Sequence, residues 1–262
     1  MVRFYTLPPD GIQWNYLLVN PNNYKILFKL KWKHAILDCG VERFLRNPNL
    51  KDYPKSFLEY WKYKAKELTE IFGEKLWITI PDYPDDYRPG QFGDNVSKTI
   101  ENIKDFIKIE GVNWLVSIQS RYLDRFSFIE SCQKAKEIIG EDYPRIAIGT
   151  VCKTKNLSFI EYCCKVTRKL FPKSQIHAFG LTLKALPRVV KVISSWDSLV
   201  ADRGGMECWR KNQDINFYSS IYQFTQFYQS YSDYLANKHK SFMYYIDRIN
   251  EILDKQRLLL EQ

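Results

Sequence analysis

The sequence predicts an α/β fold, in which a (β/α)8 TIM barrel over residues 1–205 precedes a helical extension over residues 206–262. Short apolar runs, rich in β-branched and aromatic residues, alternate with amphipathic stretches of helical period. Such runs are typical of parallel strands that are buried on both faces, and a repeated strand–helix order indicates a parallel sheet with covering helices. This many runs within about 200 residues fits a closed barrel better than an open sheet.

The candidate strands are the apolar runs that turn residues bound on both sides. They cover residues 2–6, 25–30, 35–37, 76–80, 114–118, 146–148, 176–179 and 195–200. The candidate helices are the amphipathic stretches at residues 54–72, 95–109, 126–139, 158–170 and 182–192. Glycine is common just beyond a helix C-terminus, and Gly73, Gly111 and Gly140 stand at or shortly after the ends of three of these stretches.

The character of the chain changes after Gly205. Residues 214–236 and 238–260 predict two long helices that are joined near Asn237 and lie against the barrel. Aromatic residues crowd the first of them. These aromatic side chains either pack on the barrel or form a basic, aromatic surface for nucleic acid, and their spacing is compatible with both.

The chain is basic. It has 39 Lys and Arg against 30 Asp and Glu, which gives a net charge of +9 in 262 residues. This balance favours a polyanionic partner such as a nucleic acid. The sequence holds no apolar run of membrane-spanning length and no apolar N-terminal stretch, so we expect a cytoplasmic protein without a membrane contact.

Cysteine and histidine are scattered along the chain. The six Cys include no C-x-x-C pair, and the three His stand far apart, so we expect neither a zinc site nor a disulfide framework. The glycine patterns that bind dinucleotides and nucleoside triphosphates are absent as well. We therefore expect no metal and no organic cofactor.

Polar and glycine residues follow successive candidate strands at the points where these strands end. In a TIM barrel these positions surround the active site. Three carboxylates, an amide, an aromatic ring and glycine backbone would thus meet at one mouth and bind a polar, planar ligand. The residues are Asp38, Asp82, Gln119, Gly149, Thr150, Phe179, Gly180 and Asp197, with Arg203 six positions further on.

A guanine edge suits this set. A carboxylate accepts from its N1–H and N2–H groups in fork geometry, and an amide and a backbone N–H can serve its O6. An aromatic side chain covers the face of the ring. The two remaining carboxylates suit chemistry at a sugar carbon, one as nucleophile at C1′ and the other as acid and base.

The order of these motifs resembles the tRNA-guanine transglycosylase superfamily. The pattern runs D-x-G, then Asp, a strand ending in Gln, I-G, a strand ending in x-G, and [FW]-D-[SC]-x-x-x-x-R. The resemblance spans about residues 25–205 and is best over residues 145–203. It implies a TIM barrel with Asp197 as nucleophile and Asp38 as acid and base. It further implies an arginine near the substrate backbone, Arg203, and a base-binding set of Asp82, Gln119, Gly149, Thr150, Phe179 and Gly180.

The family's zinc motif, C-x-C-x-x-C with a later His, is absent here. In this respect the chain resembles the zinc-less, DNA-modifying branch, which replaces guanine in DNA with a 7-deazaguanine. This branch implies DNA and a free 7-deazaguanine base as substrates, and partner proteins of a modification system. The alternatives are the same exchange on tRNA, a non-catalytic nucleic-acid-binding subunit, and an unrelated barrel enzyme such as a glycoside hydrolase.

Overall fold

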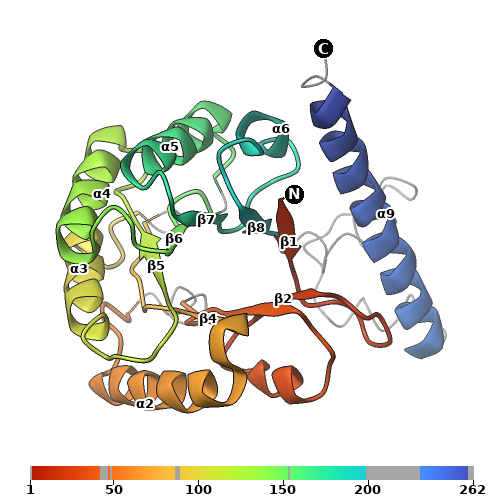
Figure 1. The fold of residues 1–262 in the computed structure, drawn as a ribbon, viewed down its shortest axis with the longest axis horizontal. Helices are drawn as coiled ribbons and strands as arrows, with labels where there is room; N and C mark the ends of the chain where they lie inside the picture. Colours follow the sequence, from red (N-terminus) through yellow and green to blue (C-terminus); the bar gives the residue numbers. More distant parts are fainter. Residues whose placement is uncertain are drawn as a thin grey trace.

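The fold is a barrel of parallel strands with helices on its outside (Figure 1). The structure is a computed structural model that describes residues 2–41, 47, 49–85, 89–152, 154–198 and 231–258. Its 8-stranded sheet has the order β1-β8-β7-β6-β5-β4-β3-β2. The strands are β1 (Arg3–Tyr5), β2 (Tyr16–Val19), β3 (His34–Leu37), β4 (Leu76–Thr79), β5 (Trp114–Ile118), β6 (Arg145–Ile148), β7 (Gln175–Ala178) and β8 (Ser195–Asp197).

The sheet closes between β1 and β2. Each pair of neighbouring strands, from β1 through β8 round to β2, is parallel, and β1 pairs with β8 in the register Tyr5 to Asp197. A parallel bridge between Thr6 and Leu17 joins the two end strands. The Thr6 N–H donates to the Tyr16 carbonyl at 3.2 Å, and the Leu18 N–H donates to the Thr6 carbonyl at 3.2 Å. The predicted (β/α)8 class is therefore confirmed.

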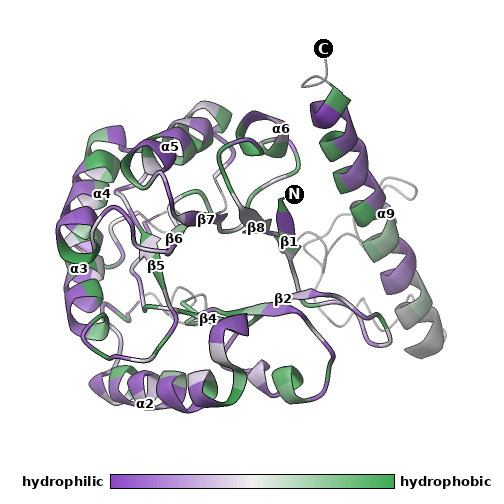
Figure 2. Cartoon of the chain, in the orientation of Figure 1, coloured by the Kyte–Doolittle hydropathy of each residue, from purple (hydrophilic) through white to green (hydrophobic). Residues whose placement is uncertain are grey.

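Helices cover the outside of the barrel. Each carries both hydrophilic and hydrophobic residues (Figure 2), and in α3 the buried Val96, Ile100 and Ile103 form one stripe at helical spacing. Asp94, Asp124 and Asn156 cap the N-termini of α3, α4 and α5 with their side chains. The elements are η1 (Tyr24–Phe28), α2 (Lys55–Phe72), η2 (Gly73–Lys75), α3 (Asn95–Phe106), α4 (Arg125–Ile139), α5 (Leu157–Leu170), α6 (Leu186–Val189) and α9 (Tyr231–Leu258).

Three expectations from the sequence are wrong in detail. Residues 25–30 form no strand: they lie largely in η1, where only Leu27 is buried, and the second strand is β2 instead. The helix expected at residues 182–192 is reduced to the single turn of α6. Helix α9 runs through Asn237, where we expected a junction, and the preceding residues 214–230 lie outside the described part of the chain.

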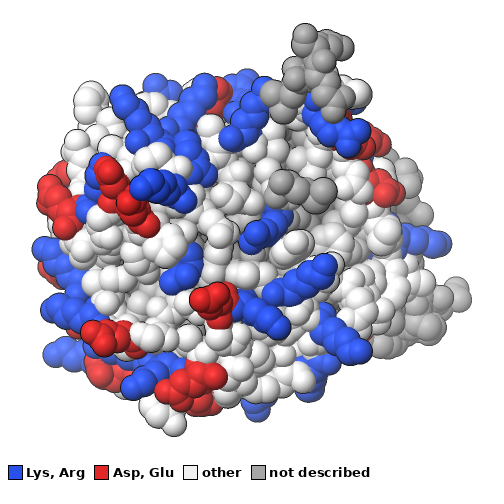
Figure 3. Space-filling model, viewed as in Figure 1, with Lys and Arg blue, Asp and Glu red and all other residues white. Residues whose placement is uncertain are grey.

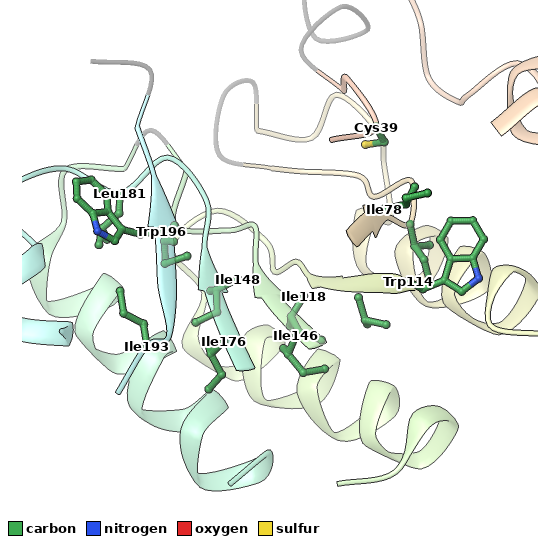
Figure 4. Close-up of a cluster of buried hydrophobic side chains, with 14 of the residues drawn as sticks. Cys39, Ile78, Trp114, Ile118, Ile146, Ile148, Ile176, Leu181, Ile193 and Trp196 are labelled. Carbon is green, nitrogen blue, oxygen red and sulfur yellow. The ribbon is translucent and has the colours of Figure 1, made fainter. Parts of the chain in front are cut away.

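Two layers of apolar side chains follow from the alternation of residues along each strand. The inner layer fills the barrel and includes Tyr5, Ile36, Trp77, Leu115 and Ala147. The outer layer lies between strands and helices, and it includes the isoleucines of β5, β6 and β7 (Figure 4). Since Tyr5 on β1 bonds to His34 on β3 at 2.8 Å, the inner layer spans strands that are not neighbours.

Helix α9 covers β1 and β8. Its Tyr245 ring lies 5.6 Å from Phe4 and 6.4 Å from Trp196, which are on the outer faces of these two strands. Its Phe242 ring meets Trp14 edge to face at 5.5 Å. The described part of the C-terminal extension is therefore helical and packs on the barrel, as expected. No helix among the described residues is long and apolar enough to cross a membrane.

In Figure 1 the strands follow one another clockwise around the barrel. Because the connections between parallel strands are right-handed, this order is seen only from the N-terminal ends of the strands. Lys and Arg side chains are spread over this face, with Asp and Glu between them (Figure 3). Lys173 pairs with Asp142 at 3.0 Å here, and Lys136 pairs with Glu141 at 2.7 Å. The candidate site lies at the opposite end of the barrel.

Candidate active site

The polar residues at the C-terminal strand ends form two bonded groups. We name the first the Asp82 cluster, which consists of Asp82, Ser117, Gln119, Cys39 and Tyr53. The second, the Asp197 cluster, consists of Asp197, His177, Gly180 and Ser195. The Asp82 cluster belongs to β3, β4, β5 and the segment before α2, whereas the Asp197 cluster belongs to β7 and β8.

Asp82 is buried and accepts two short hydrogen bonds on one oxygen. The Ser117 hydroxyl and the Gln119 Nε2 each donate to Oδ2 at 2.6 Å. Ser117 and Gln119 share the inward face of β5 with Leu115, so the carboxylate points to the barrel axis. The Cys39 thiol lies 3.5 Å from the other oxygen, Oδ1. The predicted base-reading pair of Asp82 and Gln119 is thus in direct contact.

One polar atom of the Gln119 side chain, Oε1, makes no hydrogen bond with the described residues. The Gln119 side chain is 2 % exposed. Because Nε2 already donates to the carboxylate, the remaining atom is an acceptor. A buried acceptor without a partner is costly, typically by about 1–3 kcal/mol. A ligand that brought an N–H group to Gln119 Oε1 would remove this cost.

Burial raises the pKa of Asp82, although the bonds from Ser117 and Gln119 oppose this rise. Burial also raises the pKa of the Cys39 thiol and of the Tyr53 hydroxyl well above their usual ranges. Both groups therefore stay protonated, and Tyr53 donates to the Asp82 backbone carbonyl at 2.9 Å. The only readily titrated group of this cluster is the Asp82 carboxyl itself.

The free energy of unfolding should report this titration. The pKa of Asp82 in the folded protein lies above its ordinary value of 3.8, so the proton stabilises the fold. This contribution is fully present below about pH 4 and is lost as the pH rises through the raised pKa. The Asp82→Asn variant stays neutral, and its Nδ2 can donate to a turned Gln119 amide. We expect its stability relative to the wild type to increase from pH 4 towards pH 7 in urea titrations.

The matched control for this experiment is Asp142→Asn. Asp142 is exposed and pairs with Lys173 on the opposite face of the barrel. Its removal should change the stability by less than about 1 kcal/mol at any pH, as is usual for an exposed ion pair. A stability difference between wild type and Asp82→Asn that is constant from pH 4 to pH 7 would contradict the assignment.

Gly149 leaves room for the Gln119 side chain. A Cβ atom at this position would lie 2.1 Å from Gln119 Nε2 and 2.6 Å from the Ser117 hydroxyl oxygen. The Gly149 N–H donates to the Ile118 carbonyl at 3.0 Å. Gly149 therefore contributes to the site by leaving space for the Gln119 side chain. The neighbouring Thr150 hydroxyl bonds to the Ser120 hydroxyl at 2.6 Å, which joins the ends of β5 and β6.

The Gly149→Ala variant should therefore displace Gln119 from Asp82. We expect a loss of about 1–3 kcal/mol in the free energy of unfolding, as for other overpacked cores. In a Gln119→Ala background the same substitution should cost clearly less, because most of the clash is gone. A urea-denaturation double-mutant cycle measures this coupling. Equal costs in both backgrounds would show that Gly149 serves another purpose.

Asp197 is held through one of its two oxygens. Its Oδ1 accepts from the His177 Nε2 at 3.1 Å and from the Gly180 N–H at 3.0 Å. Gly180 has a φ of 60°, and a Cβ atom there would meet the Cys152 sulfur at 2.6 Å, so the turn that aims its N–H requires glycine. Neither bond uses Oδ2. The half-buried Phe179 ring meets the His177 ring edge to face at 4.7 Å.

His177 connects Asp197 to the barrel interior. It is fully buried on β7, and its Nδ1 lies 3.0 Å from the Ser195 hydroxyl. A neutral imidazole satisfies both contacts when Nε2 carries the proton and donates to the carboxylate, while the Ser195 hydroxyl donates to Nδ1. His177 thereby fixes the orientation of the Asp197 carboxylate.

Asp38 has the inward register of His34 and Ile36 on β3, at the C-terminal end of that strand. Its backbone N–H donates to the Val19 carbonyl at 2.8 Å, which extends the β2–β3 pairing. Its side chain is half-buried, and its charge helps to raise the pKa of Cys39 and Tyr53. Asp38 therefore lies beside the Asp82 cluster. Arg203 lies outside the described residues.

Sequence reasoning missed several groups that shape the site. Ser117 could have been found from its alternation with Gln119 along β5. His177 lies in the middle of a strand, where a polar residue indicates an interior contact only when its partner is known. Asp85, buried at 6 % exposure, accepts the Tyr122 N–H at 2.8 Å and connects the segments that follow β4 and β5.

The described residues contain no group of three or more His, Cys, Asp or Glu side chains that could hold a metal ion. Comparison with known proteins adds no family assignment: no family model and no curated protein matches this chain.

Proposed function

We propose that this protein is a base-exchange glycosyltransferase of the guanine transglycosylase kind. It would replace guanine in DNA with a free 7-deazaguanine base through a covalent aspartyl intermediate at C1′. The observation that supports this most is the pairing of buried Asp82 with Gln119, whose Oε1 has no partner among the described residues. This pair and the anchored Asp197 follow strands of one barrel at their C-terminal ends.

The pair suits the donor edge of guanine. The N1–H and N2–H groups of the base are adjacent donors, and the carboxylate of Asp82 together with Gln119 Oε1 offers adjacent acceptors. Adenine presents an acceptor at N1, so it would leave a buried acceptor facing another acceptor. The partly exposed ring of Phe179 is available to cover the face of the bound base.

Asp197 would act as the nucleophile. Its Oδ2 attacks C1′ while the C1′–N9 bond breaks, and Asp38 gives a proton to the departing guanine. The sugar is then held as an aspartyl ester. Asp38 next takes the proton from N9 of the incoming 7-deazaguanine, whose nitrogen attacks C1′ and releases the Asp197 carboxylate. The two bonds on Oδ1 favour this division of work, because they leave Oδ2 to point towards substrate.

DNA is the preferred substrate of this proposal because the sequence lacks the cysteine pattern of a zinc site. The net charge of +9 attracts a polyanion of either kind, DNA or tRNA. The target nucleotide has to leave its stack to reach a barrel mouth, at a cost of a few kcal/mol in a duplex.

The test is base exchange with defined substrates. The purified protein is incubated with radiolabelled guanine and, separately, with a 7-deazaguanine, each in the presence of duplex DNA, single-stranded DNA or tRNA. We expect label to enter DNA, and nucleoside mass spectrometry to show one 7-deazaguanine gained for each guanine lost. Label in tRNA only would refute DNA as the substrate. No label in any nucleic acid would refute the enzymatic proposal and favour the alternative of a non-catalytic, nucleic-acid-binding subunit.

A further inference from the structure

Aromatic and arginine side chains are exposed together on the segment that joins β5 to α4. We name residues 121–126 the β5–α4 rim. The Phe126 side chain is 87 % exposed, the highest value among the large hydrophobic residues described, and Tyr122 is 46 % exposed. Arg121 and Arg125 are exposed beside them. Single exposed apolar residues are common, but two aromatic rings interleaved with two arginines form a surface of definite chemistry.

The rim is held in one conformation by several hydrogen bonds. The Tyr122 N–H donates to the buried Asp85 carboxylate at 2.8 Å, and the Arg121 N–H donates to the Ser127 hydroxyl at 2.8 Å. Asp124 caps α4 by accepting from the N–H groups of Phe126 and Ser127. The exposed side chains therefore stand on a rigid base, which reduces the entropy cost of binding.

The backbone of the rim is strained at Leu123. Its φ is 55°, and it is the only residue other than glycine with a positive φ in the described part of the chain. A branched side chain disfavours this conformation, which persists only where the surroundings impose it. Here Asp85 accepts from the Tyr122 N–H and Asp124 accepts from the Phe126 N–H, so the backbone is held on both sides of Leu123.

The rim adjoins the candidate active site. It begins two residues after Gln119, and the intervening Ser120 hydroxyl contacts the Arg121 carbonyl at 2.9 Å. Asp85, which holds the rim, follows Asp82 by three positions. A strand that delivers a base to Asp82 and Gln119 from this side would pass over the rim.

We propose that the β5–α4 rim is the docking surface for an unpaired stretch of the nucleic-acid strand that carries the target base. Phe126 and Tyr122 stack on bases, and Arg121 and Arg125 contact phosphates. The Arg125 guanidinium lies 4.8 Å from the Tyr162 ring centroid, which orients its charge. Arg121 and Arg125 outnumber Asp124, the single carboxylate of the rim, so the net charge of the rim favours an anion. The inference rests on the proposed function for the statement that this strand is a substrate.

Binding of a fluorescent oligothymidine to the full-length protein tests the rim without requiring exchange, because this strand contains no guanine. Phe126→Ala should weaken binding by roughly 5- to 150-fold, which is the usual effect of losing one base stack. Phe126→Trp should keep the affinity within about threefold, because tryptophan also stacks. Arg121→Ala should lower the slope of log affinity against log salt by about 1.

Tyr63→Ala is the matched control. Tyr63 is 68 % exposed on α2, away from the rim, so its removal deletes a similar aromatic surface and should leave binding unchanged. If Phe126→Ala binds as tightly as the wild type, or if Tyr63→Ala weakens binding equally, the rim proposal is overturned, whatever the exchange assay shows. If Phe126→Ala weakens binding but no nucleic acid exchanges its base, the rim stands as a docking surface and the proposed function fails.

Discussion

The Asp197→Asn variant should lose base exchange by about 10³-fold or more while remaining folded. Loss of a catalytic nucleophile removes the step that holds C1′ covalently, and such losses are among the largest seen in enzymes. The fold should tolerate the change because the asparagine Oδ1 can still accept from His177 Nε2 and from the Gly180 N–H. The amide nitrogen that replaces Oδ2 is not a nucleophile.

Three measurements check this expectation. Exchange of radiolabelled guanine should disappear, and the protein–nucleic-acid adduct should be absent from denaturing gels. Oligonucleotide affinity should remain close to that of the wild type, because phosphate contacts dominate it. Asp142→Asn serves as the control, since it makes the same chemical change at an exposed position on the opposite face. Near-normal exchange by Asp197→Asn would reject it as nucleophile and make Asp38 the next candidate.

The barrel could be predicted because most of its strands are buried on both faces. The residues of β4 and β5 are buried throughout, so their apolar runs stand out from the polar turns around them. Strand β2 is different: it alternates buried and half-buried residues over only four positions, and Asn15 and Asn20 flank it. The sequence pattern therefore favours the neighbouring apolar run at residues 25–30, which lies largely in η1. Residues 16–19 form the strand because they pair with β3, and this pairing cannot be predicted from the local sequence pattern.

The site could be predicted in part for a related reason. Parallel strands end on the same side of the barrel. Asp82, Gln119 and Asp197, at the ends of β4, β5 and β8, are therefore predicted to lie at the same end of the barrel. The specific bonds between strands could not be predicted. The contact of Asp197 with His177 depends on the register of β7 against β8, and the space for Gln119 depends on Gly149, directly after the adjacent β6.

The two clusters also divide the requirements of the proposed reaction. The Asp82 cluster consists of buried donors and acceptors that match a planar edge, and no charge needs to move there. The Asp197 cluster fixes one carboxylate oxygen and leaves the other for bond making. Selectivity and catalysis should therefore respond separately to mutation, and a variant of the first cluster should bind the wrong base while keeping a competent nucleophile.

Asp82→Asn tests this separation. The wild type should favour guanine over hypoxanthine, which lacks the N2 amino group, because a buried acceptor would otherwise lose its donor. In the variant the Gln119 amide turns over, so that the asparagine Nδ2 donates to Gln119 Oε1. Gln119 Nε2 then faces the base, and this donor meets a donor of guanine. We expect kcat/KM for guanine to fall by roughly 10²-fold or more, and the preference over hypoxanthine to shrink towards unity.

Ser117→Ala is the matched control for this loss of selectivity. It removes one of the two short bonds to Asp82 but keeps the carboxylate and its bond from Gln119. The preference for guanine should therefore survive in Ser117→Ala, even where the rate falls. Urea titration of Asp82→Asn at neutral pH measures whether the variant is folded, which separates a loss of guanine exchange from unfolding. If Asp82→Asn retains the preference for guanine, Asp82 does not read the base, and Gln119 Oε1 would have to find its donor elsewhere.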